Sequence, residues 1–392
     1  DQRVKAGVEH YLKVADGGGH CALPARAQKD GAGELLGDDG EKVAPMLEGQ
    51  EDDGCVERDS ELVFPAHLME AEREVAAKVS GLVRERAAYP EIDVGKALDW
   101  CEKRIGYVLA PGQRAAVEAA LRERVLIITG GPGVGKTTII NSALLVLQAK
   151  GVEPVLCAPT GRAAKRMSES TGLEARTIHR LLEYQGGAVG FARDADNPLE
   201  GQLFVVDELS MVDLPLMAAF LTALPAGAHL LLVGDVDQLP SVGPGCVLAD
   251  LIGSGLVPVV RLTEIFRQAE ESRIVRAAHE INEGRLPPEL ERGAPHAKGK
   301  DFFFIERDDP EAAVETLIHL VRERLPEHFG FDPFSDIQVL TPMHRGSLGT
   351  VALNARLQDA LNPANEARFE IERFGAHYRR GDKVIQLRNN YD

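Results

Sequence analysis

The sequence GGPGVGKT, residues 130–137, decides the fold of this chain, because it fits the pattern G-x-x-x-x-G-K-[ST]. It lies between the apolar run VLIIT (125–129) and the helical sequence TTIINSALLVLQAK (137–150). A strand, a glycine-rich turn and a helix in this order are the context that a phosphate-binding loop requires. Glycines let backbone N–H groups close around phosphate oxygens, and the helix N-terminus adds its positive pole. We expect the nucleotide to contact Gly130, Gly131, Pro132, Gly133, Val134, Gly135, Lys136, Thr137 and Thr138.

Hydrolysis needs a metal ion and a base beside this loop. In such loops the lysine, here Lys136, reaches the β- and γ-phosphates, and the hydroxyl of Thr137 is placed to hold Mg²⁺. The run LFVVDE (203–208) ends a predicted strand with two carboxylates that point in different directions. Asp207 is therefore placed to bind Mg²⁺, and Glu208 to orient and deprotonate the attacking water. Together with the loop, this pair predicts ATP hydrolysis rather than ATP binding alone.

Apolar runs and helical segments alternate around the loop. Besides VLIIT, the continuously apolar runs are PVLCA (154–158), LFVVD (203–207) and HLLLVGD (229–235). Strands with such sequences are covered on both faces, and alternation with helices predicts a parallel sheet with right-handed crossovers. After a Gly- and Pro-rich linker (282–300), strands are expected at 302–305 and 336–343, with helices between and after them. This second run indicates a second α/β domain that is incomplete here.

The N-terminal part has a different pattern. Helical apolar spacing occurs in GVEHYLKVAD (7–16) and EKVAPMLEG (41–49), and VERDSELVF (56–64) alternates around a polar turn like a β-hairpin. This pattern predicts a helix-turn-helix with a wing, which could serve as a packing module or as a DNA reader. A long amphipathic helix is expected over 66–88. The predicted domains are an N-terminal unit (1–92), a first ATPase domain (93–298) and a second, incomplete one (299–392).

Composition limits the class of protein. The five cysteines lie far apart, so neither a zinc site nor a disulfide framework is indicated. No apolar run approaches the roughly 18 to 20 residues of a membrane span, and we expect a cytoplasmic protein without a membrane partner. Because the sequence starts with Asp1 and stops at Asp392 after an apolar run, we expect missing pieces.

The net charge of −17 argues, taken alone, against nucleic-acid binding. About half of the acidic excess lies in residues 1–64, however, and net charge does not exclude a local basic channel.

Six motifs in order carry a resemblance to a known family. They are GGPGVGKT (130–137), APTGRAAKRM (158–167), ARTIHRLL (175–182), VVDELSMVD (205–213), VGDVDQLPSVGPG (233–245) and LTEIFRQ (262–268). In order and spacing the chain resembles the RecD-like superfamily 1 helicases, which include the alpha subunit of exodeoxyribonuclease V and its stand-alone relatives. The resemblance covers roughly residues 100–392. It implies tandem RecA-like P-loop NTPase domains, with parallel sheets and helices on both faces, behind the small N-terminal winged-helix-like domain.

The resemblance also assigns roles to residues outside the phosphate loop. Gln113 resembles the glutamine that reads adenine, Gln238 the γ-phosphate sensor, and Arg267 an arginine finger that stabilises transition-state charge. The DNA contacts that it implies fall in three clusters. The clusters comprise Thr160, Gly161, Arg162 and Lys165; Thr177 and His179; and Thr341, His344 and Arg345. Each of these residues could instead be a helix cap or part of a solvated face.

Two departures from the family pattern stand out. Leu209 follows Glu208 where relatives commonly have a small residue, and the last family motif, with a second catalytic arginine, has no counterpart before Asp392. The resemblance predicts an ATP-dependent helicase that moves 5′ to 3′ on single-stranded DNA, with Mg²⁺, and unwinds duplexes at junctions in repair or recombination. The alternative is an ATP-controlled DNA-binding or assembly subunit without unwinding. A small-molecule kinase is disfavoured, because it would not explain Gln238, Arg267 and APTGRAAKRM together.

Overall fold

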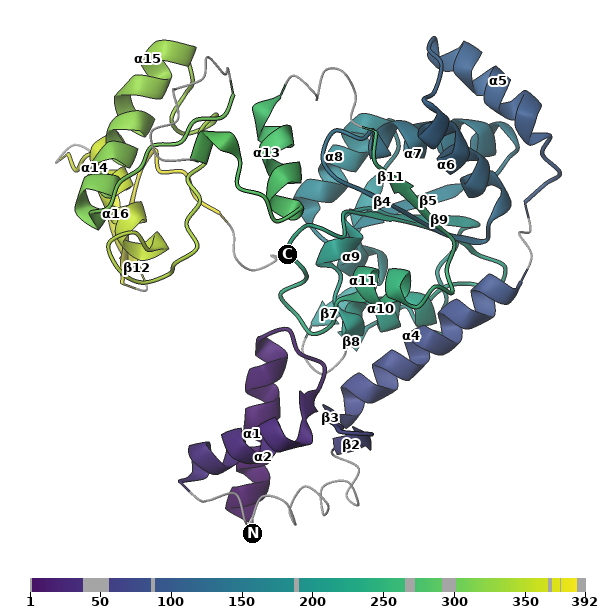
Figure 1. Cartoon of the computed structure of the whole chain (residues 1–392), viewed down its shortest axis with the longest axis horizontal. Helices are drawn as coiled ribbons and strands as arrows, with labels where there is room; N and C mark the ends of the chain where they lie inside the picture. Colours follow the sequence, from purple (N-terminus) through teal and green to yellow (C-terminus); the bar gives the residue numbers. More distant parts are fainter. Residues whose placement is uncertain are drawn as a thin grey trace. The chain divides into compact units, whose positions relative to one another are not determined.

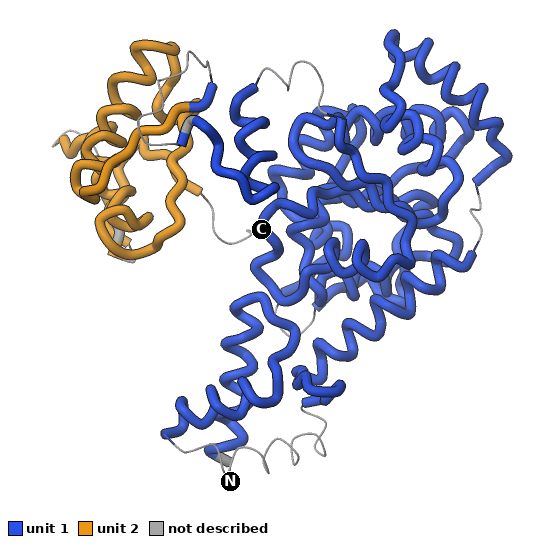
Figure 2. Tube along the Cα trace, viewed as in Figure 1, with its two compact units in different colours: residues 1–302 blue, residues 303–392 orange. Residues whose placement is uncertain are grey.

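The chain forms two compact units, residues 1–302 and residues 303–392 (Figure 2). The computed structural model describes residues 2–37, 56–85, 89–186, 190–264, 272–290, 301–365, 369–373 and 375–385. The three-domain division expected from the sequence stays a prediction.

A six-stranded parallel sheet is the centre of the first unit (Figure 1). Its strand order is β11-β4-β10-β9-β5-β6, and every neighbouring pair is parallel. The strands are β4 (Val125–Gly130), β5 (Pro154–Ala158), β6 (Ala175–Thr177), β9 (Leu203–Val206), β10 (His229–Gly234) and β11 (Val259–Leu262). The four strands expected in the first ATPase domain are confirmed, and the sheet is the RecA-like P-loop fold that the resemblance implies.

Side chains of the central strands alternate between two cores. In β4, Val125 and Ile127 pack in one core, while Leu126 and Ile128 pack in the other, as expected of consecutive strand residues. Helices therefore cover both faces. One core receives α4 (Ala66–Arg84), α9 (Ile178–Leu181), α10 (Leu214–Thr222) and α11 (Val247–Gly253). The other receives α5 (Val94–Ile105), α6 (Pro111–Arg122), α7 (Lys136–Ala149) and part of α8 (Gly161–Thr171).

The N-terminal segment is a small α/β unit with its own apolar core. It contains α1 (Gln2–Gly17), α2 (Ala25–Leu36) and an antiparallel sheet of β1 (Leu23–Pro24), β3 (Leu62–Pro65) and β2 (Val56–Asp59). The β2–β3 pairing confirms the predicted hairpin. The expected helix over 41–49 lies outside the described residues, and α4 begins directly after β3. Among the described residues, no helix combines the length and apolar character needed to cross a membrane.

The second unit is helical in its described part. It contains α14 (Pro310–His319), a π-helical turn η4 (Leu320–Arg324), α15 (Leu325–Phe329), α16 (Thr350–Leu361) and a hairpin of β12 (Glu370–Arg373) and β13 (Ala376–Arg379). The strands expected at 302–305 and 336–343 do not form, so these two predictions are wrong. Neither run pairs with another strand among the described residues, and Leu340 is 85% exposed. An apolar run becomes a strand only where a neighbour completes its hydrogen bonds.

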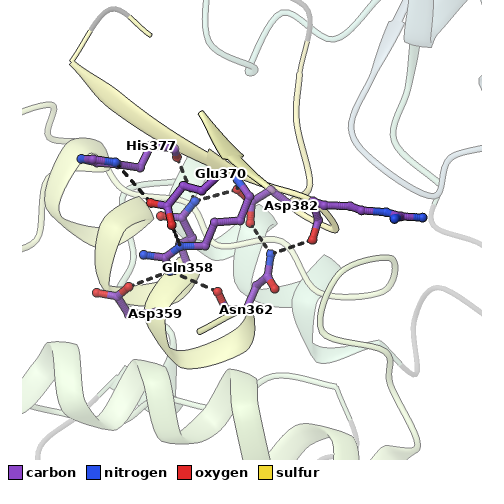
Figure 3. A network of polar contacts seen from close by, with 8 residues as sticks. Gln358, Asp359, Asn362, Glu370, His377 and Asp382 are labelled. Atoms are coloured by element: carbon purple, nitrogen blue, oxygen red, sulfur yellow. Dashed lines mark hydrogen bonds and ion pairs between the residues drawn. The ribbon is translucent and has the colours of Figure 1, made fainter. Parts of the chain in front are cut away.

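A polar network ties α16 to the β12–β13 hairpin region (Figure 3). The carboxylate of Asp382 accepts hydrogen bonds from Gln358 Nε2 (2.6 Å) and Asn362 Nδ2 (2.7 Å). Arg379 Nη1 donates to Asp359 Oδ1 at 2.8 Å. These bonds hold the hairpin against the helix in a unit with few buried apolar side chains.

Candidate nucleotide and DNA site

Three neighbouring strands of the first unit end in polar sequence at one edge of the sheet. The phosphate loop follows β4, Asp207 and Glu208 follow β9, and Asp235 follows β10, which lies between the other two strands. Because parallel strands present their carboxyl ends at the same edge, these residues meet in the place where open α/β sheets bind ligands.

The phosphate loop has a backbone that only glycine adopts without strain. Gly133 and Gly135 have φ values of 78° and 81°. At Gly130, a Cβ atom would lie 2.7 Å from the carbonyl oxygen of Leu262 on β11. The glycines are therefore needed for the turn itself and for the approach of the neighbouring strand. This cradle fits a phosphate chain, because backbone N–H groups face it at the start of α7.

Lys136 is the first residue of α7, and its side chain turns back over the loop. Its ammonium group donates to the carbonyl oxygens of Gly130 and, at 3.1 Å, Gly131. The positive charge of Lys136 also lowers the pKa of both Asp207 and Glu208, which opposes the larger effect of burial. The lysine and the two carboxylates thus belong to one electrostatic cluster.

Asp207 is held by the backbone that follows it. Its Oδ1 accepts the N–H of Glu208 at 2.9 Å, and burial raises the pKa of its carboxyl group. A half-buried carboxylate opposite a phosphate loop is the ligand type that Mg²⁺ uses in such sites.

Glu208 has an unusual backbone. Its φ of 54° and ψ of 42° lie in the left-handed region, which L residues rarely adopt. Burial raises the pKa of its carboxyl group, and the charges of Asp207 and Asp235 raise it further. Strained backbone and a shifted carboxyl pKa are both typical of functional positions. The residue after it, Leu209, begins the short helix η2 (Leu209–Met211) and is fully buried in the core, so this departure from the family pattern fills core space.

The end of β10 holds Gln238. Asp235 is 2% exposed, and its Oδ2 accepts from Gln238 Nε2 at 3.3 Å. Its Oδ1 accepts the N–H of Asp237 at 3.2 Å, and Thr129 Oγ1 on β4 accepts the N–H of Val236 at 3.3 Å. The segment with the expected γ-phosphate sensor is therefore anchored both to a buried carboxylate and to the strand that carries the phosphate loop.

Gln113 and Arg267 are the two remaining predicted nucleotide contacts, and the structure describes only Gln113. Gln113 is 4% exposed, and its Oε1 accepts the N–H of Ala110 at the start of α6 (3.2 Å). That bond gives Gln113 a role in helix capping, and its contact with adenine stays a prediction. Arg267 lies outside the described residues.

The first two candidate DNA clusters follow neighbouring strands. Thr160 follows β5 and caps α8 through the N–H of Ala163 (3.2 Å), and Thr177 ends β6 and caps α9 through the N–H of Arg180 (3.1 Å). Both threonines are thus helix caps, one of the alternatives left open by the sequence. The other members are Gly161, Arg162 and Lys165, all exposed on α8, and His179 on α9.

His179 is part of an aromatic group. Its ring lies 5.7 Å from that of Tyr184 and 5.8 Å from that of Phe191, measured between centroids. These aromatic residues belong to the small hairpin of β7 (Tyr184–Gly186) and β8 (Gly190–Phe191). His179 is therefore held by ring packing beside the hairpin, and its DNA contact stays a prediction.

The third cluster lies in the second unit, in the loop before α16. Thr341 Oγ1 donates to the carbonyl oxygen of Leu348 at 2.6 Å, and His344 Nδ1 lies 2.8 Å from Thr350 Oγ1. These two side chains maintain the loop, while Arg345 is exposed.

Sequence reasoning missed two residues at the nucleotide site. The positive charge of Arg166 on α8 lowers the pKa of Asp207 and of Glu208. Arg166 lies four residues after Arg162 on the same helix, so the sequence spacing could have identified it as a neighbour of that residue. The second is His279, whose ring faces Gly131 of the phosphate loop. It lies far along the sequence from the loop, and no motif pointed to it.

The sequence is similar to known proteins across this site and beyond it. Residues 113–244 match the family described as the AAA domain. Over 391 residues the chain is 34% identical to the ATP-dependent RecD2 DNA helicase of Deinococcus radiodurans, covering 100% of this chain and 49% of that protein. Over 164 residues it is 44% identical to RecBCD enzyme subunit RecD of Mycobacterium tuberculosis, covering 36% of this chain and 28% of that protein. The chain thus spans about half the length of the first relative and less of the second.

Among solved structures, the Pif1 helicase from Candida albicans is 21% identical, with a TM-score of 0.37 over 54% of this chain and 55% of that one. A TM-score this low carries no information about the fold, which the parallel sheet defines.

Proposed function

We propose that this chain, which is similar to a RecD2 DNA helicase along its whole length and carries the predicted motifs from about residue 100 onward, is the motor part of an ATP-dependent DNA helicase. In this proposal it hydrolyses ATP, moves 5′ to 3′ along single-stranded DNA and unwinds duplex at junctions during repair or recombination. One observation carries the proposal: the phosphate loop, the acidic pair and the Asp235–Gln238 segment end three neighbouring strands at one sheet edge.

The residues at this edge fit a nucleotide with Mg²⁺. Thr137 and Asp207 would hold the ion, which supplies positive charge against the phosphates when it is bound. Lys136 places a further positive charge on the phosphate chain. Glu208, with a carboxyl pKa raised by burial, accepts the proton of the attacking water, and Gln238 is placed to contact the terminal phosphate. Arg267 completes this set as the expected arginine finger.

DNA contact is proposed for the residues after β5 and β6 and for the loop before α16. Because β5 and β6 are neighbouring parallel strands, Thr160 and Thr177 lie at the same sheet edge, where α8 begins and exposed Arg162 adds a cation. Helix N-termini and arginine side chains bind backbone phosphates without reading sequence. This is the mode of contact that a motor needs, because it must accept every base.

Lys136→Ala is the decisive test of the ATPase. The variant should lose DNA-stimulated ATP hydrolysis and stay folded, because within the described residues the hydrogen bonds of the ammonium group go to loop carbonyls and not to a core. ATPase assays and thermal unfolding are measured on the same preparation of the full-length protein. Substantial remaining turnover would remove the assignment of the phosphate loop.

Helicase action needs a separate measurement. Strand displacement is followed on duplexes with a 5′ or a 3′ single-stranded tail, with Lys136→Ala as the control. Unwinding of the 5′-tailed substrate alone is expected. ATPase activity without displacement of either substrate would favour an ATP-controlled binding or assembly subunit instead.

A further inference from the structure

His279 lies against the phosphate loop from a distant part of the sequence. It belongs to α13 (Arg273–Asn282), which Ser272 caps through the N–H of Val275. A Cβ atom built on Gly131 would lie 2.9 Å from Cε1 and 3.3 Å from Nε2 of the imidazole. The ring edge that carries Nε2 therefore faces the loop, and Gly131 must lack a side chain to admit it.

Among the described residues, Nε2 of His279 has no hydrogen-bond partner, and the atom is shielded from solvent. Leaving a buried polar atom unpaired is unfavourable, and such atoms in native structures are commonly explained by a ligand or a catalytic role. The carbonyl oxygen of Gly131 already accepts from Lys136, so a partner from outside the protein is the simplest way to satisfy the imidazole.

We propose that His279 is a nucleotide-contacting residue, whose Nε2–H donates a hydrogen bond to a phosphate oxygen of the nucleotide that the loop holds. The inference rests on the proposed nucleotide site and adds a residue to it. It also gives α13, the helix that carries His279, a direct role at that site.

The test compares three substitutions by equilibrium titration with ADP and with a non-hydrolysable ATP analogue. His279→Phe keeps the ring and removes the donor, His279→Gln places an amide N–H near the position of Nε2, and His279→Asn places one near Nδ1. A hydrogen bond to a charged group is typically strong enough that its loss weakens binding about tenfold or more. We expect this loss for Phe and Asn, with binding largely restored in Gln. His67→Phe, at an exposed position on α4, is the matched control and should bind like wild type.

Two patterns of weakened binding in His279→Phe would support the proposal. They identify different phosphates as the partner of Nε2. Weakened binding of the ATP analogue alone assigns the γ-phosphate, and weakened binding of both nucleotides assigns an inner one. Wild-type affinity for both nucleotides in His279→Phe would overturn the proposal, and so would a Gln variant no better than Phe. If the wild-type protein binds neither nucleotide, the proposed ATPase site is wrong. That outcome differs from an error in the His279 assignment alone, in which the wild-type protein still binds nucleotide.

A double-mutant cycle tests the contact without nucleotide. Gly131→Ala should lower the melting temperature in wild type, because the new Cβ meets the imidazole, and should have a much smaller effect in His279→Ala. Equal effects of Gly131→Ala in both backgrounds would show that the ring does not pack on the loop.

Discussion

At the scale of single residues, the proposed base Glu208 combines two features that lower stability. Its left-handed backbone is strained, and its carboxylate is buried near two other carboxylates. Strain of this kind is of order 1–3 kcal/mol and persists only where the surrounding structure enforces it. Here the neighbours enforce it, because Leu209 is fixed in the core on one side and β9 on the other.

Glu208→Gln should therefore stop turnover and stabilise the fold. The substitution removes the base but leaves Asp207 in place, so nucleotide binding should persist. Burial raises the pKa of the Glu208 carboxyl group above its unfolded value of about 4.3. At pH values above the raised pKa, the charged carboxylate of Glu208 therefore destabilises the folded state. This destabilisation disappears as pH falls from the raised pKa to the unfolded value.

Thermal unfolding from pH 7.5 down to pH 4 checks this sign. The variant should melt at a higher temperature than wild type at neutral pH, and the gain should shrink toward pH 4. A gain in stability that is independent of pH would mean that the Glu208 charge is not the cause.

Site residues could be predicted where local sequence determines their surroundings. The phosphate loop and the acidic pair each follow an apolar run, so their place at strand ends follows from sequence alone. His279 could not be predicted, because its contact with Gly131 depends on how α13 packs and not on any local pattern. The capping of α6 by Gln113 was missed for a related reason, since the same motif fits an adenine contact.

At the scale of elements, strand prediction succeeded where both faces of the sheet are covered. β4, β9 and β10 are buried almost throughout, and their runs contain no polar interruption. FFFI (302–305) is equally apolar, whereas DIQVLTPM (336–343) includes Asp336, Gln338 and Thr341, and no strand forms in either run. An apolar run satisfies the burial that a core strand requires. Strand pairing also depends on residues elsewhere in the chain.

His229, the first residue of β10, predicts a pH dependence of stability. Its ring is 2% exposed and stacks on Tyr89, with 3.4 Å between centroids. Burial, assisted by the charge of Arg124, lowers the pKa of His229 to about 4, below its unfolded value of about 6.5. Stability is therefore complete above pH 6.5 and is lost as pH falls from there toward 4.

Replacement of His229 by Leu should remove this dependence. Between pH 7.5 and pH 5, wild type should lose about 2 kcal/mol more of its free energy of unfolding than the variant, a magnitude that follows from the linkage of the shift. Denaturant unfolding at the two pH values measures the difference, and His67→Leu is the control at an exposed histidine. Parallel losses in wild type and His229→Leu would contradict the assignment.

At the scale of the whole molecule, a net charge of −17 has to be reconciled with the proposed binding to single-stranded DNA. We expect local cations on each unit to serve, including Arg162 in the first unit and Arg345 in the second. If about five phosphates are neutralised, log affinity should fall with log salt at a slope of roughly −3.5, from about −0.7 per phosphate. Little sequence preference should accompany this binding.

Replacing Arg162 and Arg345 together should make the slope of log affinity against log salt shallower by about one to two units. DNA should then no longer stimulate ATP hydrolysis by this double variant. Salt titration of binding to an oligonucleotide compares this double variant with wild type. The control replaces Arg104 and Arg122, two exposed arginines on α5 and α6, and changes net charge equally. An unchanged slope in the first variant would place the DNA path elsewhere.

In the proposed motor, the order of strands also sets the distance between the nucleotide site and the DNA-contacting residues. Neighbouring strands lie about 4.8 Å apart, so β4 and β5, with β10 and β9 between them, are roughly 14 Å apart. The phosphate loop begins at one and the residues around Thr160 follow the other. Glu208 and Gln238 lie on the two intervening strand ends. In the proposed motor, a movement passed from nucleotide to DNA along this edge therefore crosses the proposed base Glu208 and the proposed γ-phosphate sensor Gln238, over a distance that the width of the sheet sets.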